Sequence, residues 1–281
     1  MSQEKSMKRD FSNLKKEQIR DFWIDFSNKT DFTNPILSYG YHKAIKDNLN
    51  GFTAFNKVFK EKEKLFTRAR IHNSKRTLFP NISDVWYPPD EYVNVGRANY
   101  PHNSVYYCSN DAGTTIFEIR PEKGDWLTSL EIEIKKDELD LLMLGINTKT
   151  TPAFEKLSEV DKGINMFLEE KFREIVPRGK EHNYFKTAHF TEAFLKNRDG
   201  LRYPSVGSNC KGWNVIFTKE FVDKYGKFKK AVVHEVIEKK SEYDITIKCN
   251  HIATHINQYG DFIWETVADC NGHLITEEIY D

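Results

Sequence analysis

Two different spacings of apolar residues occur along this chain of 281 residues, and they constrain its fold more than any single motif. Through the first 60 residues, and again between residues 152 and 175, apolar side chains recur at helical spacing. In Leu65–Ile71 and Trp126–Ile134 apolar and polar residues alternate, as in strands with one buried face. Because both periods occur close together in one chain, we expect a mixed α+β fold.

The distribution of these patterns predicts three parts. Residues 1–61 form a helical N-terminal extension, interrupted at Asn34-Pro35. Residues 62–222 combine short strands and helices in one core, and residues 223–281 turn to strands and form a β-rich C-terminal extension. No repeat or low-complexity linker separates these parts, so we expect both extensions to pack on the core.

The composition narrows the class of protein. Basic and acidic residues balance at 42 each, and 39% of the residues are hydrophobic, as in a globular protein with a buried core. The balanced charge does not favour nucleic acid as a partner. The four cysteines are widely separated, no run of about 18 apolar residues exists, and the first residues lack the apolar core of a secretory signal. We therefore expect a soluble, cytoplasmic protein with reduced thiols and no membrane partner.

Four residues carry the chemistry that this sequence suggests. Arg97 lies beside a glycine, and Tyr107 follows it by ten residues. Glu118 follows Tyr107 by eleven residues, and Ser205 comes far downstream. A cation, an aromatic ring, a carboxylate and a hydroxyl are the groups needed to hold a dinucleotide and to break its nicotinamide–ribose bond. Each residue alone has an ordinary structural explanation, so only the combination points to a site.

Arg97 and Tyr107 suit the two ends of such a ligand. The guanidinium fork of Arg97 matches a pyrophosphate, and the ring of Tyr107 can stack on a nicotinamide, whose positive charge adds a cation–π attraction. The structural alternatives are a surface arginine and a core tyrosine on a strand. Because successive strand residues point to opposite faces, only one of Tyr106 and Tyr107 can face a given cleft.

Glu118 and Ser205 suit the bond that breaks. Glu118 ends a short helix predicted at 110–119 with Ser109 as a candidate cap, and its carboxylate can stabilise an oxocarbenium-like ribose. The alternative is a helix-end glutamate paired with Arg120. Ser205 follows a proline in an expected loop and can hydrogen-bond the ribose, the nicotinamide amide or Glu118. Its flanks do not match the Gly-x-Ser-x-Gly motif of serine hydrolases.

The segments around these residues form a pattern over about 160 residues, from Leu65 to Val222. They are Gly96-Arg97-x-Asn99, Val105-x-Tyr107, Phe117-Glu118-Ile119, Asp199-Gly200-x-x-Tyr203-Pro204-Ser205 and Trp213-Asn214. In this order and spacing they resemble the RES-domain family. The chain departs from typical members in length, with about 60 additional residues at each end.

The resemblance implies an ADP-ribosyltransferase-like mixed β core with helices, and NAD⁺ as the substrate with no metal. Several members of the family are toxins that degrade NAD⁺ by hydrolysis or phosphorolysis and are neutralised by a helix-turn-helix Xre-type antitoxin. Such an antitoxin, or another inhibitory protein, is therefore the implied protein partner. The implied NAD⁺ site comprises Arg97, Tyr107, Glu118 and Ser205, with Asn99, Asn214 and one of Arg68 and Arg70 as further ligand-binding candidates.

We therefore expect an NAD⁺-consuming enzyme, a toxin or defence effector, that cleaves the nicotinamide–ribose bond with water or phosphate as the acceptor. Two alternatives stay open: transfer of ADP-ribose to a macromolecule, and a non-catalytic module that senses NAD⁺ and binds a partner. Self-association also stays open. Cys249-x-His251-x-x-x-His255 lacks the His-Glu-x-x-His pattern, so no metal site is expected there.

Overall fold

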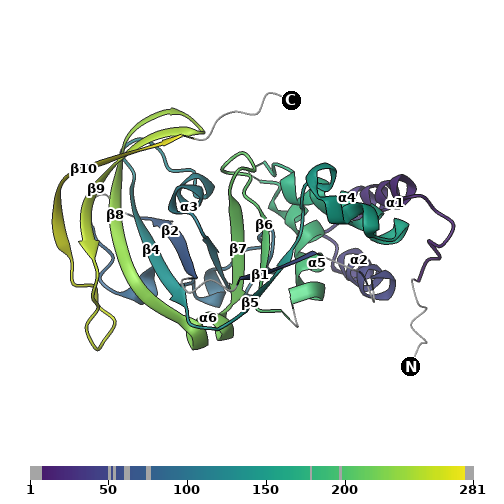
Figure 1. The fold of residues 1–281 in the computed structure, drawn as a ribbon, viewed down its shortest axis with the longest axis horizontal. Helices are drawn as coiled ribbons and strands as arrows, with labels where there is room; N and C mark the ends of the chain where they lie inside the picture. Colours follow the sequence, from purple (N-terminus) through teal and green to yellow (C-terminus); the bar gives the residue numbers. More distant parts are fainter. Residues whose placement is uncertain are drawn as a thin grey trace. The chain divides into compact units, whose positions relative to one another are not determined.

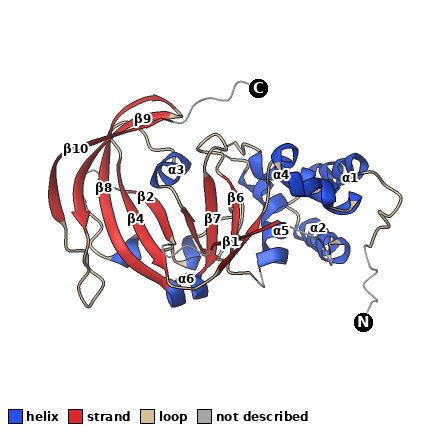
Figure 2. Ribbon diagram, in the orientation of Figure 1, coloured by secondary structure: helices blue, strands red, loops and turns tan. Residues whose placement is uncertain are grey.

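A computed structural model describes residues 8–275 apart from 50–51, 53–54, 60–63, 74–76, 178 and 196–197. Helices are combined with both parallel and antiparallel strand pairs, which confirms the α+β class (Figure 2). None of the described helices is long and apolar enough to span a membrane.

The chain forms two compact units, each assembled from separate segments. Unit 1 comprises residues 1–57, 93–103 and 140–203, and unit 2 comprises residues 58–92, 104–139 and 204–281. The grouping therefore differs from the linear division into three parts that the sequence suggested. The reason is that the helices of the N-terminal segment pack with helices from the middle of the chain, which local patterns do not reveal.

Unit 1 is built mainly from helices (Figure 1). They are α1 (Lys16–Lys29), α2 (Pro35–Asn48), α4 (Glu159–Arg173) and α5 (Phe185–Leu195). Trp23 of α1 is fully buried, and its ring centroid lies 6.3 Å from that of Tyr41 and 5.8 Å from that of Phe190. At Gly163 of α4 an added Cβ would lie only 2.6 Å from Cβ of Ile19, so glycine permits the close approach of α1.

The helix predicted at 152–175 begins later than the pattern indicated. Pro152–Lys156 forms a separate 3₁₀ helix, and α4 starts after Ser158, whose backbone is extended. The hydroxyl oxygen of Ser158 accepts a 3.1 Å hydrogen bond from the N–H of Asp161. This N-cap satisfies a donor at the start of α4 and separates the two helices.

Three of the strands are short. They are β1 (Phe55–Phe59), β5 (Leu139–Met143) and β6 (Gly200–Pro204). β5 and β6 are parallel, with Leu141 opposite Gly200. The expectation of a loop before Ser205 is therefore wrong for residues 200–204, because every residue of β6 is buried and the strand pairs with β5.

Unit 2 contains a long run of antiparallel strands in the order β7-β3-β2-β4-β8-β9-β10. Their bounds are β2 (Leu65–Ile71), β3 (Val105–Ser109), β4 (Trp126–Ile134), β7 (Trp213–Thr218), β8 (Gly226–Ser241), β9 (Asp244–Ala253) and β10 (Glu265–Ile275). β2 and β4 have the bounds that alternation predicted, and Leu65 lies opposite Glu133 in their ladder. The C-terminal segment thus supplies three long strands of this sheet.

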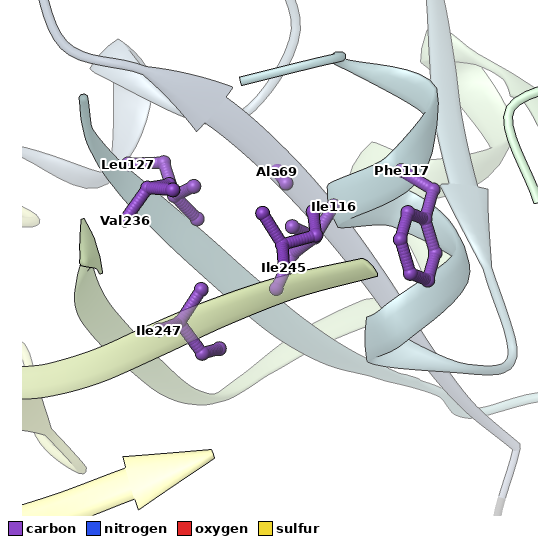
Figure 3. Packing of buried hydrophobic residues seen from close by; sticks show 7 residues of the cluster. All are labelled: Ala69, Ile116, Phe117, Leu127, Val236, Ile245 and Ile247. Carbon is purple, nitrogen blue, oxygen red and sulfur yellow. The ribbon is translucent and has the colours of Figure 1, made fainter. Parts of the chain in front are cut away.

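Two helices belong to unit 2, α3 (Ala112–Glu118) and α6 (Lys219–Tyr225). α3 buries Ile116 and Phe117 in a cluster with side chains of β2, β4, β8 and β9 (Figure 3). The cluster consists of Ala69, Ile116, Phe117, Leu127, Val236, Ile245 and Ile247. This packing fixes α3 on one face of the sheet, and Glu118 is its last residue.

The N-cap of α3 is Asp111, not Ser109 as the sequence suggested. The Asp111 carboxylate accepts hydrogen bonds from the N–H groups of Gly113 and Thr114 at 3.2 and 2.8 Å. Ser109 instead accepts a hydrogen bond from the N–H of Asp111 at 3.1 Å. The helix starts two residues later than predicted, and the carboxylate also complements the positive end of the helix.

Candidate functional site

One oxygen of the Glu118 carboxylate is the meeting point of three hydrogen bonds in unit 2. Oε1 accepts from the hydroxyl of Ser205 at 2.6 Å, from the backbone N–H of Gly207 at 3.0 Å and from the amide of Asn214 at 2.8 Å. The donors come from the segment after β6 and from β7, far from Glu118 in the sequence. Three donors on one oxygen hold the side chain in a single orientation. Arg120, the partner suggested by the structural alternative, is not among them.

The other oxygen of Glu118, Oε2, receives no hydrogen bond from the residues that the structure describes. The side chain as a whole is partly exposed. The carboxylate is therefore anchored through Oε1 and can offer Oε2 to a ligand. This division of roles between two oxygens is what a carboxylate needs to act on a developing positive charge without swinging away from it.

The loop from Ser205 to Gly212 packs closely against α3 at two glycines. An added Cβ at Gly207 would lie 2.7 Å from Cα of Glu118, and one at Gly212 would lie 2.0 Å from Oγ1 of Thr114. No side chain fits in these gaps, so both glycines are required for the approach. The loop is closed by a hydrogen bond of 2.9 Å from the N–H of Ser205 to the carbonyl of Gly212.

Ser205 itself is completely buried. Its hydroxyl donates to Glu118 and accepts from the N–H of Ser208 at 3.1 Å. The sequence suggested that Ser205 bonds the ribose, the nicotinamide amide or Glu118. Among the described residues, it bonds Glu118. Asn214 is also buried, with 6% of its surface exposed, and its amide likewise points to Glu118.

The strand register places Tyr107 on the same face of the sheet as this cluster. Ser109 pairs with Asn214, and Tyr107 pairs with Ile216 two residues along the same ladder. Residues two apart on a strand share a face, and directly paired residues share it too. Tyr107 is partly exposed, whereas Tyr106 on the opposite face is fully buried. Of the two tyrosines, Tyr107 is thus the one on the Glu118 face.

The same parity places Arg68 and Arg70 on the opposite face. Thr67 pairs with Ser109 between β2 and β3, so Thr67 and Ala69 lie on the α3 face and the two arginines on the other. Arg68 donates to the carbonyls of Val85 and Tyr107, both at 3.2 Å. The pairing of β2 with β3 therefore places both candidate arginines on the sheet face opposite α3, and their ligand-binding role stays a prediction.

Both arginines contact backbone carbonyls and aromatic rings on that opposite face. The guanidinium of Arg68 lies 5.9 Å from the ring centroid of Tyr106, and burial lowers the pKa of Arg68. Arg70 donates to the carbonyl of Asp84 and lies 5.4 Å from the ring centroid of Phe79. Both side chains tie the segment before β3 to the sheet, which is a structural role.

Arg97 and Asn99 belong to unit 1. The buried guanidinium of Arg97 donates to the carbonyls of Lys171 and Glu174, each at 2.9 Å, and lies 5.2 Å from the ring centroid of Tyr184. It therefore caps the C-terminal end of α4, where carbonyls lack partners within the helix. Asn99 donates to the carbonyls of Asn94 and Tyr100 at 2.8 and 2.9 Å and holds its own turn.

A cysteine–histidine pair lies elsewhere in unit 2. Sγ of Cys249 is 3.4 Å from Nδ1 of His234, and Nε2 of His234 is 2.9 Å from the hydroxyl of Ser129. Burial lowers the pKa of His234 to about 4, so its ring is neutral at physiological pH. Cys108, Cys210 and Cys249 form no disulfide within the described part of the chain. Within the described residues no group of three or more His, Cys, Asp and Glu is arranged to hold a metal ion.

The sequence pattern identified Glu118, Ser205 and Asn214, but it missed the backbone donor Gly207 and the glycine contacts. The only signal for Gly207 in the sequence is its position two residues after Ser205. A search of curated proteins finds no match to this chain. The model of the RES domain matches residues 67–234, which is more than half of the chain and includes every residue of the Glu118 cluster. The chain therefore belongs to the RES-domain family.

Proposed function

We propose that this protein consumes NAD⁺ by cleaving the bond between nicotinamide and ribose, with Glu118 as the residue that stabilises the reacting ribose. The observation that supports this most strongly is the anchored carboxylate with one oxygen held by three donors and the other left for a ligand. Membership of the RES family is consistent with an NAD-related function.

In the proposed reaction the C–N bond between ribose and nicotinamide breaks, and the bonding electron pair leaves with the neutral nicotinamide. The anomeric carbon then carries oxocarbenium-like positive charge, which Oε2 of Glu118 stabilises. Water or phosphate adds to that carbon, and a proton of water is released to the solvent. Because Oε1 is already fixed, the carboxylate loses little freedom in the transition state.

Other residues have supporting roles in this proposal. Tyr107 stacks on the nicotinamide from the same sheet face as Glu118. Ser205 and Asn214 position the carboxylate and do not contact the substrate, since both are buried. Arg97 was expected to hold the phosphates. Arg97 belongs to unit 1 and donates two hydrogen bonds to the end of α4, so its phosphate contact stays a separate prediction.

The test is release of nicotinamide from NAD⁺ by the purified full chain, with and without phosphate. We expect release by the parent protein and a loss of at least about 100-fold in kcat for Glu118→Gln, because removing one preorganised electrostatic partner of the transition state typically costs that much. Glu122→Gln, an exposed glutamate paired with Lys239, is the matched control and should retain the parental rate.

The products separate the acceptors. ADP-ribose indicates hydrolysis, and ADP-ribose 1-phosphate formed only with phosphate indicates phosphorolysis. Label from NAD⁺ that remains on a macromolecule would instead support ADP-ribosyl transfer. Binding of NAD⁺ without release of nicotinamide under any of these conditions would contradict the proposal and favour a sensing module.

A further inference from the structure

Unit 1 contains a cavity that has no part in the proposed cleavage of NAD⁺. Its volume is about 620 Å³, enough for a small organic molecule, and it is lined by residues of α2 and α5 together with Phe32, Tyr100 and His182. The lining contains four phenyl or phenol rings, three histidines and one carboxylate. No lysine or arginine is among the lining residues.

The aromatic side chains form connected walls. The rings of Phe32 and Phe185 are nearly parallel, with an angle of 15° and a centroid distance of 6.4 Å. The ring of Tyr100 lies 5.9 Å from that of Phe185, and Tyr39 stands at the rim with 56% of its surface exposed. The faces of such rings carry partial negative charge, so a cage of them attracts cations.

Two of the three histidines in the wall, His42 and His189, are held by hydrogen bonds. Nε2 of the buried His189 lies 3.1 Å from the hydroxyl of Ser38, and its Nδ1 lies 3.2 Å from Nδ1 of His42. Burial, with the charge of His42 as a second cause, lowers the pKa of His189 to about 3. Burial also lowers the pKa of His42, against the charge of Glu192 and together with that of Lys46. At neutral pH both rings are therefore uncharged and do not repel a cation.

Glu192 supplies the negative charge. Its side chain is 49% exposed, and Oε2 lies 3.5 Å from Nδ1 of His42. Tyr100, whose hydroxyl bonds to His189, remains protonated because burial and the charge of Glu192 raise its pKa. Glu192 is the only lining residue that carries a carboxylate.

We propose that this cavity binds a small organic cation of the alkylammonium or quaternary ammonium class, with the rings as a cage and Glu192 as the counter-ion. The two features complement one another. The rings favour a diffuse charge that is weakly hydrated, and the carboxylate at the rim remains solvated until the ligand enters. The site uses none of the residues assigned to NAD⁺ cleavage, so it stands apart from that proposal.

The experiment compares two molecules of nearly equal shape that differ in charge. Binding of choline and of its uncharged isostere 3,3-dimethylbutan-1-ol to the full chain is measured by calorimetry and by ligand-observed NMR. We expect saturable binding of choline and binding of the isostere that is at least tenfold weaker, which corresponds to about 1.4 kcal/mol. Equal affinity for both molecules, or no saturable binding of choline, would overturn the proposal.

Substitutions in the lining test whether choline binds in this cavity. Glu192→Gln and Tyr39→Leu change partly exposed side chains, so we expect both to fold, and each should weaken choline binding severalfold. Glu155→Gln, whose side chain is 71% exposed and lies outside the lining, is the matched control and should bind choline as the parent does. Unchanged choline affinity in both cavity variants, with folding confirmed by circular dichroism, would place the cation elsewhere and refute the assignment.

Discussion

The hydroxyl of Ser205 donates a 2.6 Å hydrogen bond to Oε1 of Glu118, although 87 positions separate the two residues in the chain. Ser205 has no exposed surface, so it affects a bound ligand through Glu118. The relationship separates two roles that the sequence alone leaves joined: in the proposed reaction the serine positions the carboxylate, and the carboxylate contacts the substrate.

Ser205→Ala removes one of the three donors to Glu118 and leaves the remaining two. We expect kcat for nicotinamide release to fall by about 10- to 100-fold, since a hydrogen bond to a charged group contributes about 1.5–3 kcal/mol. KM should change little, because Ser205 cannot reach the substrate. Ser208→Ala, a buried serine of the same loop whose hydroxyl accepts from Gly212, is the control. A raised KM with unchanged kcat would assign Ser205 to substrate binding instead.

Gly207→Ala places a methyl group 2.7 Å from Cα of Glu118, where neither backbone can move freely. We expect a loss of about 1–3 kcal/mol in the free energy of unfolding, measured by urea denaturation, together with a lower kcat. Gly40→Ala is the matched control, because a Cβ at Gly40 of α2 meets nothing within 4 Å. That change should stabilise the protein by about 0.5–1 kcal/mol, since alanine favours the helix. Equal effects at the two positions would refute the close-packing argument.

Asn214→Asp keeps the size of the side chain but replaces an amide donor, 2.8 Å from Glu118, with a second carboxylate. Repulsion between the two charges should lower kcat/KM more than Asn214→Ala does, by at least about tenfold beyond the loss of the donor. The difference between the two variants should narrow at lower pH, where protonation relieves the repulsion. Steady-state kinetics between neutral and mildly acidic pH provide the comparison. An aspartate variant as active as the alanine variant would show that Asn214 does not act through Glu118.

Arg97→Ala removes two hydrogen bonds to the carbonyls of Lys171 and Glu174 at the end of α4. We expect a loss of about 2–4 kcal/mol in the free energy of unfolding, because both bonds are charge-assisted and they are buried and part-buried, respectively. Arg97→Lys keeps the charge but cannot reach both carbonyls in the same fork geometry, so it should restore only part of the stability. If the variants are as stable as the parent, the capping role is wrong. A raised KM for NAD⁺ in folded Arg97→Lys would support the phosphate contact.

Acidification should destabilise the protein through its buried histidines. Burial lowers the pKa of His234 from 6.5 to about 4, so the unfolded chain binds more protons than the folded one below pH 6.5. The contribution is therefore complete above pH 6.5 and is lost as the pH falls toward 4, by about 1.4 kcal/mol per pH unit. Urea denaturation at pH 7.5, 6.5 and 5 measures this slope. His234→Gln should reduce this slope by the contribution of about one bound proton. Substitution of the exposed His255 by Gln should leave the slope unchanged.

Local sequence predicted much of the fold because local forces determine it. Alternation marked β2 and β4 with the bounds observed, and helical spacing marked α1, α2 and α4. Where the predicted first residue of a helix was wrong, an N-cap side chain accepted hydrogen bonds from backbone N–H groups of the first turn. These caps are Asp111 at α3 and Ser158 at α4. A capping preference distinguishes poorly between neighbouring Ser and Asp residues, so such ends shift by a few residues.

The sequence predicted only part of the candidate site. The segments whose order and spacing resemble the RES family contain Glu118, Ser205 and Asn214, and these three meet in the structure. The motifs also drew attention to Arg68 and Arg70. Alternation shows that these two share a face, but only the pairing of Thr67 with Ser109 shows that this face lies opposite α3. Register between strands depends on contacts that no local pattern contains.

By itself, then, the sequence determined the elements, the family and the chemical types of residue in the site. The tertiary structure decided which atoms meet: that Oε1 of Glu118 is held, that Gly207 contributes a backbone donor, and that residues 1–57 pack with 140–203 in one unit. Periodicity and capping act over a few residues, whereas these contacts join segments separated by tens of residues. They form only when apolar burial brings those segments together, so their partners follow from packing and not from local preference.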